Sequence, residues 1–326
     1  MKAKLPPNPI KASTREFIRE ARQTKDYSLF DFVHGYVYAR WPYLYIGIGT
    51  GEHRTARILK PVFSRISRWL DTLRAGNSSD GQRPDSAAGQ TGDRVTFADT
   101  YHGKVVPLAS ARKLVTVNEE IELPDLEKVL PYKRARDIIL RNPDHIAVLE
   151  CPCRSSRQQP CLPLDVCLIV GEPFASFVIE HHPKKARMIS QAEAVDILEA
   201  ENQRGHVHHA FFKDAMLGRF YAICNCCSCC CGAMQAHRNG TPMLASSGYV
   251  SQVDPELCAG CSDCTEYCQF GAITVVSSCA IIDQDICMGC GVCVELCPNG
   301  AVSLVRDSSR GEPLEIFDLM EEAASG

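Results

Sequence analysis

The sequence predicts an α+β fold, with a central domain that could also be α/β and a small separate domain at the C-terminal end. Strand-like and helix-like patterns alternate across residues 100–223, which is typical of a sheet covered by helices. One cysteine pattern is then written twice between Cys258 and Cys297, so two similar halves follow each other. The 326 residues can form two or three domains, and a hydrophobic content of 45% is enough for a core.

Residues 1–73 form a basic segment that is predicted to be helical and aromatic. A capping-box pattern at Ser13 predicts a helix over 13–24. Residues 27–48 are rich in aromatic and β-branched types, which predicts one or two strands. A helix is also predicted from Pro61, with arginines opposite an apolar face, and it could lie on a membrane surface or on the protein's own core.

Residues 74–94 are rich in Gly, Ser, Asp and Gln without apolar periodicity, and they predict a disordered linker. A cysteine-rich α/β module is expected over 95–248. Its predicted elements are a strand over 115–121, a helix from Pro131 to Pro143, a strand over 145–150, a helix from Ser190 to Gly205, and strands over 207–212 and 220–223.

Ten of the 19 cysteines lie in two groups of this module, and such groups in a chain without an N-terminal secretory signal are expected to bind metal. If 224–231 is extended, its side chains alternate between two sides, and one short segment could serve two sites. The module could then hold one or two iron–sulfur clusters, an unusual cluster, or one cluster and zinc. The candidate ligands are Cys151, Cys153, Cys161 and Cys167, and Cys224, Cys226 and Cys230 on one side with Cys227, Cys229 and Cys231 on the other.

Three further residues near the cysteines are of interest. His208 is a weak candidate for a metal ligand or a proton relay, because most histidines in such positions are structural. Arg154 could offset the charge of a cluster, or form an ordinary surface ion pair. Cys279 matches no position of the repeat and is predicted to be a buried thiol.

The duplicated pattern is CxxCxxCxxxC, and its spacing fits a 4Fe-4S cluster. Each of the four irons needs one external thiolate, and two-residue gaps let a tight loop reach three corners of the cube. A pair of zinc sites is the alternative, but zinc rarely requires three closely spaced cysteines and a distant fourth in duplicate. Glycines 260, 289 and 291 are expected to let backbone N–H groups approach the sulfur atoms.

Residues 249–306 resemble a bacterial-type ferredoxin domain with two 4Fe-4S clusters, and short strands are expected at Val275 and Leu304. The resemblance implies that the last cysteine of each run ligates the cluster of the other run. Gln269 stands where the family usually has proline, which leaves the packing around Cys268 open. The implied ligands are Cys258, Cys261, Cys264 and Cys297 for one cluster, and Cys287, Cys290, Cys293 and Cys268 for the second.

The central module carries a second resemblance. Its CxCR, ISxxEAxxIL, GHVH and CNCCxCCC segments, at 151–154, 189–198, 205–208 and 224–231, are similar to an iron–sulfur module found in uncharacterised ferredoxin-containing proteins of anaerobic bacteria. This resemblance implies redox work in anaerobic metabolism, but it implies no substrate.

Charge is distributed unevenly along the chain, whose formal net charge is -4. Residues 1–70 carry 13 Lys and Arg against 5 Asp and Glu, whereas residues 249–326 carry 2 against 13. The acidic end, with an acidic tail over 307–326, is expected to attract a basic face of a redox partner. Without a secretory signal or a transmembrane span, the expected location is the cytoplasm.

The sequence thus predicts an iron–sulfur electron-transfer protein whose partner is a flavoprotein or another iron–sulfur protein. An oxidoreductase with a catalytic cluster in the central module, fed by the ferredoxin domain, is the alternative, so the question of enzyme or carrier stays open. A zinc-binding regulatory or interaction module is a weaker alternative. No nucleic-acid-binding motif is present in the sequence, and no nucleic-acid partner is expected.

Overall fold

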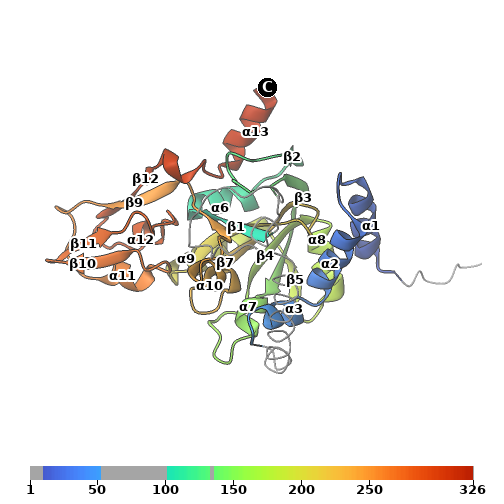
Figure 1. Cartoon of the computed structure of the whole chain (residues 1–326), viewed down its shortest axis with the longest axis horizontal. Coiled ribbons are helices and arrows are strands. Elements are labelled where there is room, and N and C mark those ends of the chain that lie inside the picture. Colours follow the sequence, from blue (N-terminus) through green and yellow to red (C-terminus); the bar gives the residue numbers. More distant parts are fainter. Residues whose placement is uncertain (1–9, 53–100, 133–135, 326) are drawn as a thin grey trace, which may run out of the picture.

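The computed structural model describes residues 10–52, 101–132 and 136–325 (Figure 1). The helix predicted from Pro61, with its membrane contact, and the linker predicted over 74–94 lie outside these ranges. Within the described part, none of the helices has the length and apolar character needed to cross a membrane.

A mixed sheet of eight strands forms the centre of the chain. Its order is β2-β3-β4-β7-β6-β1-β8, with β5 paired to β3. Neighbouring strands are antiparallel, except that β8 runs parallel to β1. The strands are β1 (Tyr101–Val106), β2 (Ile121–Leu123), β3 (Ile138–Glu150), β4 (Asp165–Glu172), β5 (Ala186–Ile189), β6 (Val207–Lys213), β7 (Arg219–Cys226) and β8 (Leu244–Ala245).

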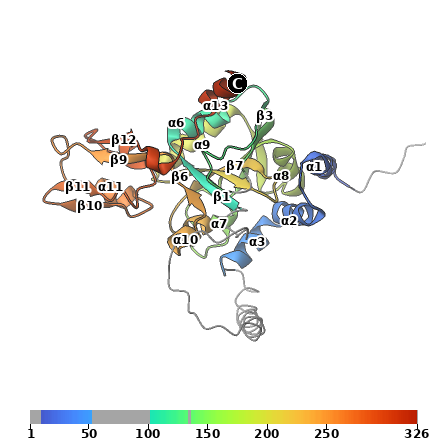
Figure 2. The same cartoon turned by 45° about the horizontal axis from the view of Figure 1, so that its top comes forward.

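Helices cover both faces of the sheet, because side chains alternate along each strand and both faces are apolar. Phe211 enters one core and its neighbour Phe212 enters the other. Figure 2 shows α6 (Leu108–Val115), α9 (Gln191–Gln203) and α13 (Ile316–Ser325) on one side of the sheet. The other side is covered by α1 (Ala12–Gln23), α2 (Leu29–Arg40), α3 (Pro42–Gly49), α7 (Pro152–Ser155), α8 (Phe174–His181) and α10 (Gly232–Arg238).

The described part of the N-terminal segment consists of α1, α2 and α3 joined by short turns, so the prediction of strands over 27–48 was wrong. A capping box starts α2: the Ser28 side chain accepts a hydrogen bond from the Asp31 N–H, and the Asp31 carboxylate accepts one from the Ser28 N–H. Tyr27, Phe32, Tyr36 and Tyr38 pack against α8 and the sheet, whereas Phe30 and Trp41 are exposed. Tertiary burial thus outweighed their preference for strands.

The helix predicted over 13–24 is confirmed as α1, but its predicted cap was wrong. Lys11 is the N-cap residue, and the Ser13 hydroxyl instead donates to the Glu180 carboxylate of α8 at 2.5 Å. The residue that looked like a cap therefore fixes α1 to α8.

The central module confirms most of its predicted elements and corrects two of them. The strand over 145–150 lies within β3, the helix after Ser190 is α9, and the later strands are β6 and β7. The predicted strand over 115–121 was wrong, since α6 ends at Val115 and β2 begins only at Ile121. The helix expected after Pro131 was wrong over 138–142, where β3 already runs and buries Ile138 and Leu140 in the core shared with α6 and α9.

The C-terminal domain lies at one end of the sheet, beside α9 and α10 (Figure 1). Two small antiparallel sheets, β9–β12 and β10–β11, confirm the short strands expected at Val275 and Leu304. Residues 307–326 were expected to form an acidic tail, yet Leu314 and Ile316 are buried beneath α6. The remaining elements are β9 (Tyr249–Val253), α11 (Asp263–Tyr267), β10 (Ile273–Val276), β11 (Cys279–Ile282), α12 (Val292–Glu295), β12 (Val302–Arg306) and a 3₁₀ turn at Ser308–Arg310.

Candidate metal centres

The duplicated cysteine pattern folds into two separate groups of four thiols. In each group, three cysteines come from one run and the fourth comes from the other run. A backbone N–H donates to each of the exchanged sulfur atoms in the same way: from Ala272 to Cys268 at 3.2 Å, and from Ala301 to Cys297 at 3.3 Å. The outer quartet is Cys258, Cys261, Cys264 and Cys297, and the inner quartet is Cys268, Cys287, Cys290 and Cys293, each around its own small cavity.

The two quartets differ in their exposure. Cys261 of the outer quartet is exposed, whereas Cys287 and Cys293 of the inner quartet are buried. Backbone N–H groups of Ala280 and Gly260 lower the pKa of the Cys258 thiol, while burial raises the pKa of Cys293 to about 11. The outer quartet therefore faces solvent, and the inner quartet faces the interior.

The interior next to the inner quartet is the central domain. Met288 and Val292, which flank Cys290, are buried in the same core as the strands β4, β6 and β7. Pro107 approaches Gly291, and Tyr267 packs against Gly205 at the end of α9. The C-terminal domain is thus packed onto the module through the side that carries the inner quartet.

Gln269, which replaces the usual proline after Cys268, links the two domains through two side-chain hydrogen bonds. Its side-chain N–H donates to the Gly205 carbonyl at 3.0 Å, and its side-chain oxygen accepts from the Ser228 N–H at 2.8 Å. Ser228 lies between Cys227 and Cys229 of the central module. A proline at this position would lack both polar groups, so the departure from the family pattern has a structural role here.

A matched pair of glycines tests how closely the inner quartet is packed. Gly289 and Gly300 both have positive φ, at 65° and 60°, but a Cβ on Gly289 would lie 2.1 Å from the Tyr249 carbonyl oxygen, while one on Gly300 would meet nothing within 4 Å. We expect Gly300→Ala to cost about 1–2 kcal/mol for the left-handed backbone alone. Gly289→Ala should lower the free energy of unfolding by about 1–3 kcal/mol more than Gly300→Ala does, since β9, which carries Tyr249, must also move.

Anaerobic thermal denaturation followed by cluster absorbance measures both glycine variants. Equal losses of stability in the two would contradict the close contact between the Gly289 loop and β9.

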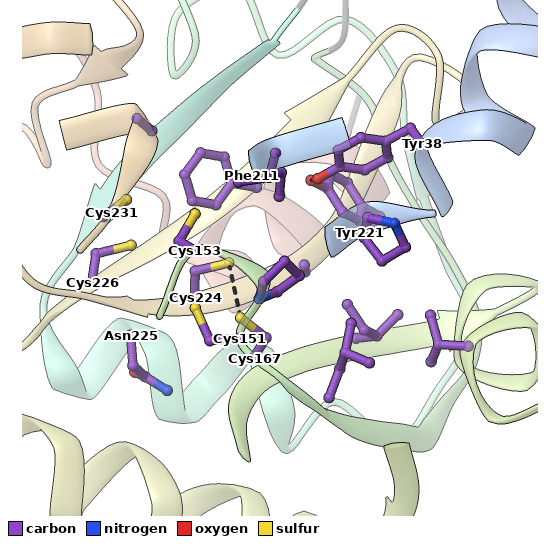
Figure 3. Close-up of a pocket in the computed structure, with 18 of the residues that line it drawn as sticks. Tyr38, Cys151, Cys153, Cys167, Phe211, Tyr221, Cys224, Asn225, Cys226 and Cys231 are labelled. Carbon is purple, nitrogen blue, oxygen red and sulfur yellow. Dashed lines mark hydrogen bonds between the residues drawn. The ribbon is translucent and has the colours of Figure 1, made fainter. Parts of the chain in front are cut away.

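Six cysteines of the central module meet on the face of the sheet that α2, α3 and α7 cover, and Figure 3 shows their sulfur atoms gathered in one region. The sulfur atoms of Cys167 and Cys224, from β4 and β7, are 3.9 Å apart. Cys151 lies beside both Cys153 and Cys167. Cys231 lies beside both Cys153 and Cys226. These six are called the pocket cysteines: Cys151, Cys153, Cys167, Cys224, Cys226 and Cys231; Cys227 and Cys230 also reach the wall of the same cavity.

The pocket cysteines border an apolar cavity of about 80 Å³. The hydrogen bond to Cys153 and burial raise the pKa of Cys151 to about 12. Contact with Cys231 favours the thiolate of Cys226, but burial outweighs it and raises the pKa of Cys226 to about 12. Six thiolates without a cation would thus be unfavourable in this place, whereas a bound metal would stabilise them and release their protons.

The remaining four cysteines of the module form a loop quartet: Cys161, Cys227, Cys229 and Cys230. Their sulfur atoms all lie within 4.8 Å of one another. The segment 224–231 does supply two groups, but it is extended only to Cys226 and then turns. The predicted alternation was therefore wrong for Cys230 and Cys231, which lie in the opposite groups to those predicted.

Arg154 lies between the two central groups, in the field of both Cys151 and Cys227. It is completely buried, so the interpretation as a surface ion pair was wrong. Its guanidinium pairs with the buried Glu201 carboxylate and donates to the Pro163 and Asn225 carbonyl oxygens at 2.6 and 3.0 Å.

The other two residues singled out in the sequence lie outside the pocket. His208 is buried on the far face of the sheet, where its Nδ1 lies 2.6 Å from the Asn225 side-chain oxygen. Cys279 at the start of β11 is half-buried, so the prediction of a buried thiol was wrong.

Sequence reasoning missed the residues that close the cavity opposite the cysteines. The hydroxyl groups of Tyr38 and Tyr221 are 2.8 Å apart, and Tyr101 also lines the wall. Burial lowers the pKa of Lys213, behind these rings, to about 8. The capping box at Ser28 was the local signal that could have placed Tyr38 on a helix.

A family model described as a 4Fe-4S binding domain matches residues 251–274 and 280–303. The two matched segments contain all eight cysteines of the outer and inner quartets. The match supports a C-terminal ferredoxin-type domain that binds 4Fe-4S clusters, and with it an iron–sulfur electron-transfer role. No curated protein matches the chain.

Proposed function

We propose that this chain is an electron-transfer protein in which two ferredoxin clusters exchange electrons with a further iron–sulfur cluster held by the pocket cysteines. The outer quartet would hold the first cluster and the inner quartet the second. The observation that carries this proposal is the position of the inner quartet, which lies between an exposed quartet and the central module.

The order of the clusters follows from burial. The exposed outer quartet is the part of the chain that a partner can approach, and the domain around it is acidic. A flavoprotein or iron–sulfur protein with a basic face fits this surface. Electrons would pass between this partner and the inner cluster through the outer cluster.

The packing of the two domains supports the next step. The side chain of Gln269 connects the residue after Cys268 to the loop that carries Cys227 and Cys229. Apolar residues around the inner quartet continue into the core that contains the pocket cysteines. The cluster of the inner quartet would therefore be close to the central cluster and shielded from water.

The central cluster is proposed from the donor set. Six thiols, four buried and two half-buried, exceed the four that one cube needs, and they lie around a single cavity. The soft thiolate donors favour an iron–sulfur cluster over a hard cation such as Mg²⁺ or Ca²⁺.

Rapid freeze-quench electron paramagnetic resonance tests the order of transfer. The protein would be mixed with a reduced flavoprotein, which is too large to enter the pocket. We expect the central signal to appear after the ferredoxin signals, and Cys264→Ser, which removes an outer ligand, to slow it by more than an order of magnitude. An unchanged rate of appearance of the central signal in Cys264→Ser would overturn the proposed path.

A second candidate function is an oxidoreductase with a catalytic central cluster. It is favoured by the apolar cavity and by the three tyrosine rings that contact Lys213 beside it. A neutral compound in the cavity would meet the cluster on one side and the hydroxyl groups of Tyr38 and Tyr221 as proton donors on the other. A small-molecule ligand that changes the central signal but not the ferredoxin signals would favour this function; the absence of any such change across a compound set would count against it.

A further inference from the structure

We propose that the loop quartet binds a single zinc ion, distinct from the iron–sulfur clusters. Cys161, from the loop between α7 and β4, joins Cys227, Cys229 and Cys230, from the loop between β7 and α10. This inference is independent of the proposed electron path, since it rests on the spacing of these four sulfur atoms.

The spacing fits one ion at the centre of four thiolates. A zinc–sulfur bond is about 2.3 Å, so the sulfur atoms of a tetrahedral site lie roughly 3.8 Å apart. The loop quartet has all four sulfur atoms within 4.8 Å of one another, with Cys161 and Cys229 at 3.2 Å and Cys229 and Cys230 at 3.6 Å. These separations are longer than a disulfide bond of about 2.05 Å. They are too short to enclose a cube, which places an iron between each thiolate and the centre.

The ferredoxin domain provides an internal reference for the size of a cluster site. Its two quartets match the 4Fe-4S pattern, yet neither brings three ligand atoms within 4.8 Å of one another. The pocket cysteines do not do so either, and among the described residues the loop quartet is the group that meets this criterion. The loop quartet therefore differs from the two ferredoxin quartets: its four sulfur atoms are close enough together to surround one ion.

The position of the loop quartet gives the ion a structural role. Cys161 lies between Cys153 and Cys167 in the sequence, and Cys227 to Cys230 lie between Cys226 and Cys231. One ion would thus tie together the two segments that carry all six pocket cysteines. Cys227 and Cys230 also line the cavity, so the zinc site would form part of its wall.

Zinc suits this role because it has no redox chemistry and accepts four thiolates in a closed tetrahedron. Four thiolates and Zn²⁺ carry a net charge of −2, and two arginines lie beside them. Arg154 is buried in the field of Cys227, and Arg157 donates to the Cys230 carbonyl oxygen at 3.0 Å. The zinc ion would thus fix the segments that hold the neighbouring iron–sulfur cluster, and it would take no part in electron transfer.

Metal analysis of the full-length protein, purified anaerobically, tests the proposal. We expect about one zinc per chain, with X-ray absorption at the zinc edge giving four sulfur ligands at about 2.3 Å. Cys229→Ser changes the exposed member of the quartet, which does not line the cavity, and it should lose the zinc while keeping the full iron content. Cys279→Ser is the matched control and should keep both metals.

Three results would overturn the assignment. The wild-type protein could contain no zinc, Cys229→Ser could lose about four irons instead of one zinc, or mass spectrometry could find Cys161 and Cys229 joined in a disulfide. The zinc content and the zinc-edge spectrum of the wild-type protein test the assignment without any variant, so the test holds even if Cys229→Ser does not fold. The iron count is read separately, so failure of the zinc site would leave the proposed electron path untouched.

Discussion

Replacing Cys153 and Cys226 by serine is expected to reduce the iron content to about eight atoms per chain, the content of two 4Fe-4S clusters. Both side chains lie among the pocket cysteines, and each sits beside Cys231. Serine keeps the size of the side chain but does not provide a soft thiolate. The double variant should therefore lose the central cluster as a unit.

The ferredoxin signals should remain in this variant, because the outer and inner quartets keep all their ligands. Zinc should remain as well, since the loop quartet is untouched. Cys279→Ser is again the matched control, as a half-buried cysteine that belongs to neither central group. An unchanged iron content in the double variant would show that the pocket cysteines hold no cluster.

The second large effect is expected at Glu201, whose replacement by leucine should destabilise the protein by about 3–5 kcal/mol. Glu201 and Arg154 are 1% and 0% exposed, so the change leaves a buried guanidinium without its carboxylate. For a domain of this size the loss corresponds to a fall of roughly 6–20 °C in the melting temperature. Replacing the pair together, with Arg154→Met and Glu201→Leu, should be much milder, because no uncompensated charge is then buried.

The pH dependence of Glu201 gives a further check on the same pair. Burial raises the pKa of Glu201, but hydrogen bonds from His206 and Arg154 outweigh it, and the net shift is downward. A lowered pKa stabilises the fold above the usual carboxyl pKa of about 4.3, and this contribution is lost as the pH falls through the depressed value. Anaerobic melting curves of wild type and Glu201→Gln should therefore differ near neutral pH and converge in acid; a constant difference would contradict the assignment.

The ferredoxin part of the chain could be predicted closely from the sequence, because its cysteines follow one another at fixed short spacing. The exchange of Cys268 and Cys297 between the runs was implied by the family resemblance, and the structure places them in that way. The role of Gln269 could not be predicted, since its partners Gly205 and Ser228 lie far away in the sequence.

The central groups were harder to partition. Their division depends on where the chain turns after Cys226, and a run of cysteines contains no local signal for that turn. Cys161 joins the loop quartet, whereas Cys153 and Cys167 on either side of it do not, which only the path of the α7–β4 loop decides. The sequence identified these cysteines as candidates, but their grouping could be seen only in the fold.

The N-terminal helices show a different limit. Residues 27–48 have the composition of strands, and their burial against α8 overrides that preference. The local capping box at Ser28 was the better guide, because hydrogen bonds at a helix start depend on a few neighbouring residues. Because this capping box was not used, the position of Tyr38 on a helix at the cavity wall was not predicted.

The central claim is that iron is bound by thiolates in the module as well as in the ferredoxin domain. Iron and sulfide analysis of the full-length protein, prepared without oxygen and followed by a redox titration with electron paramagnetic resonance, measures this most directly. We predict at least about twelve irons per chain and a signal beyond those of the two ferredoxin clusters. About eight irons, with the two ferredoxin signals alone, would contradict the claim.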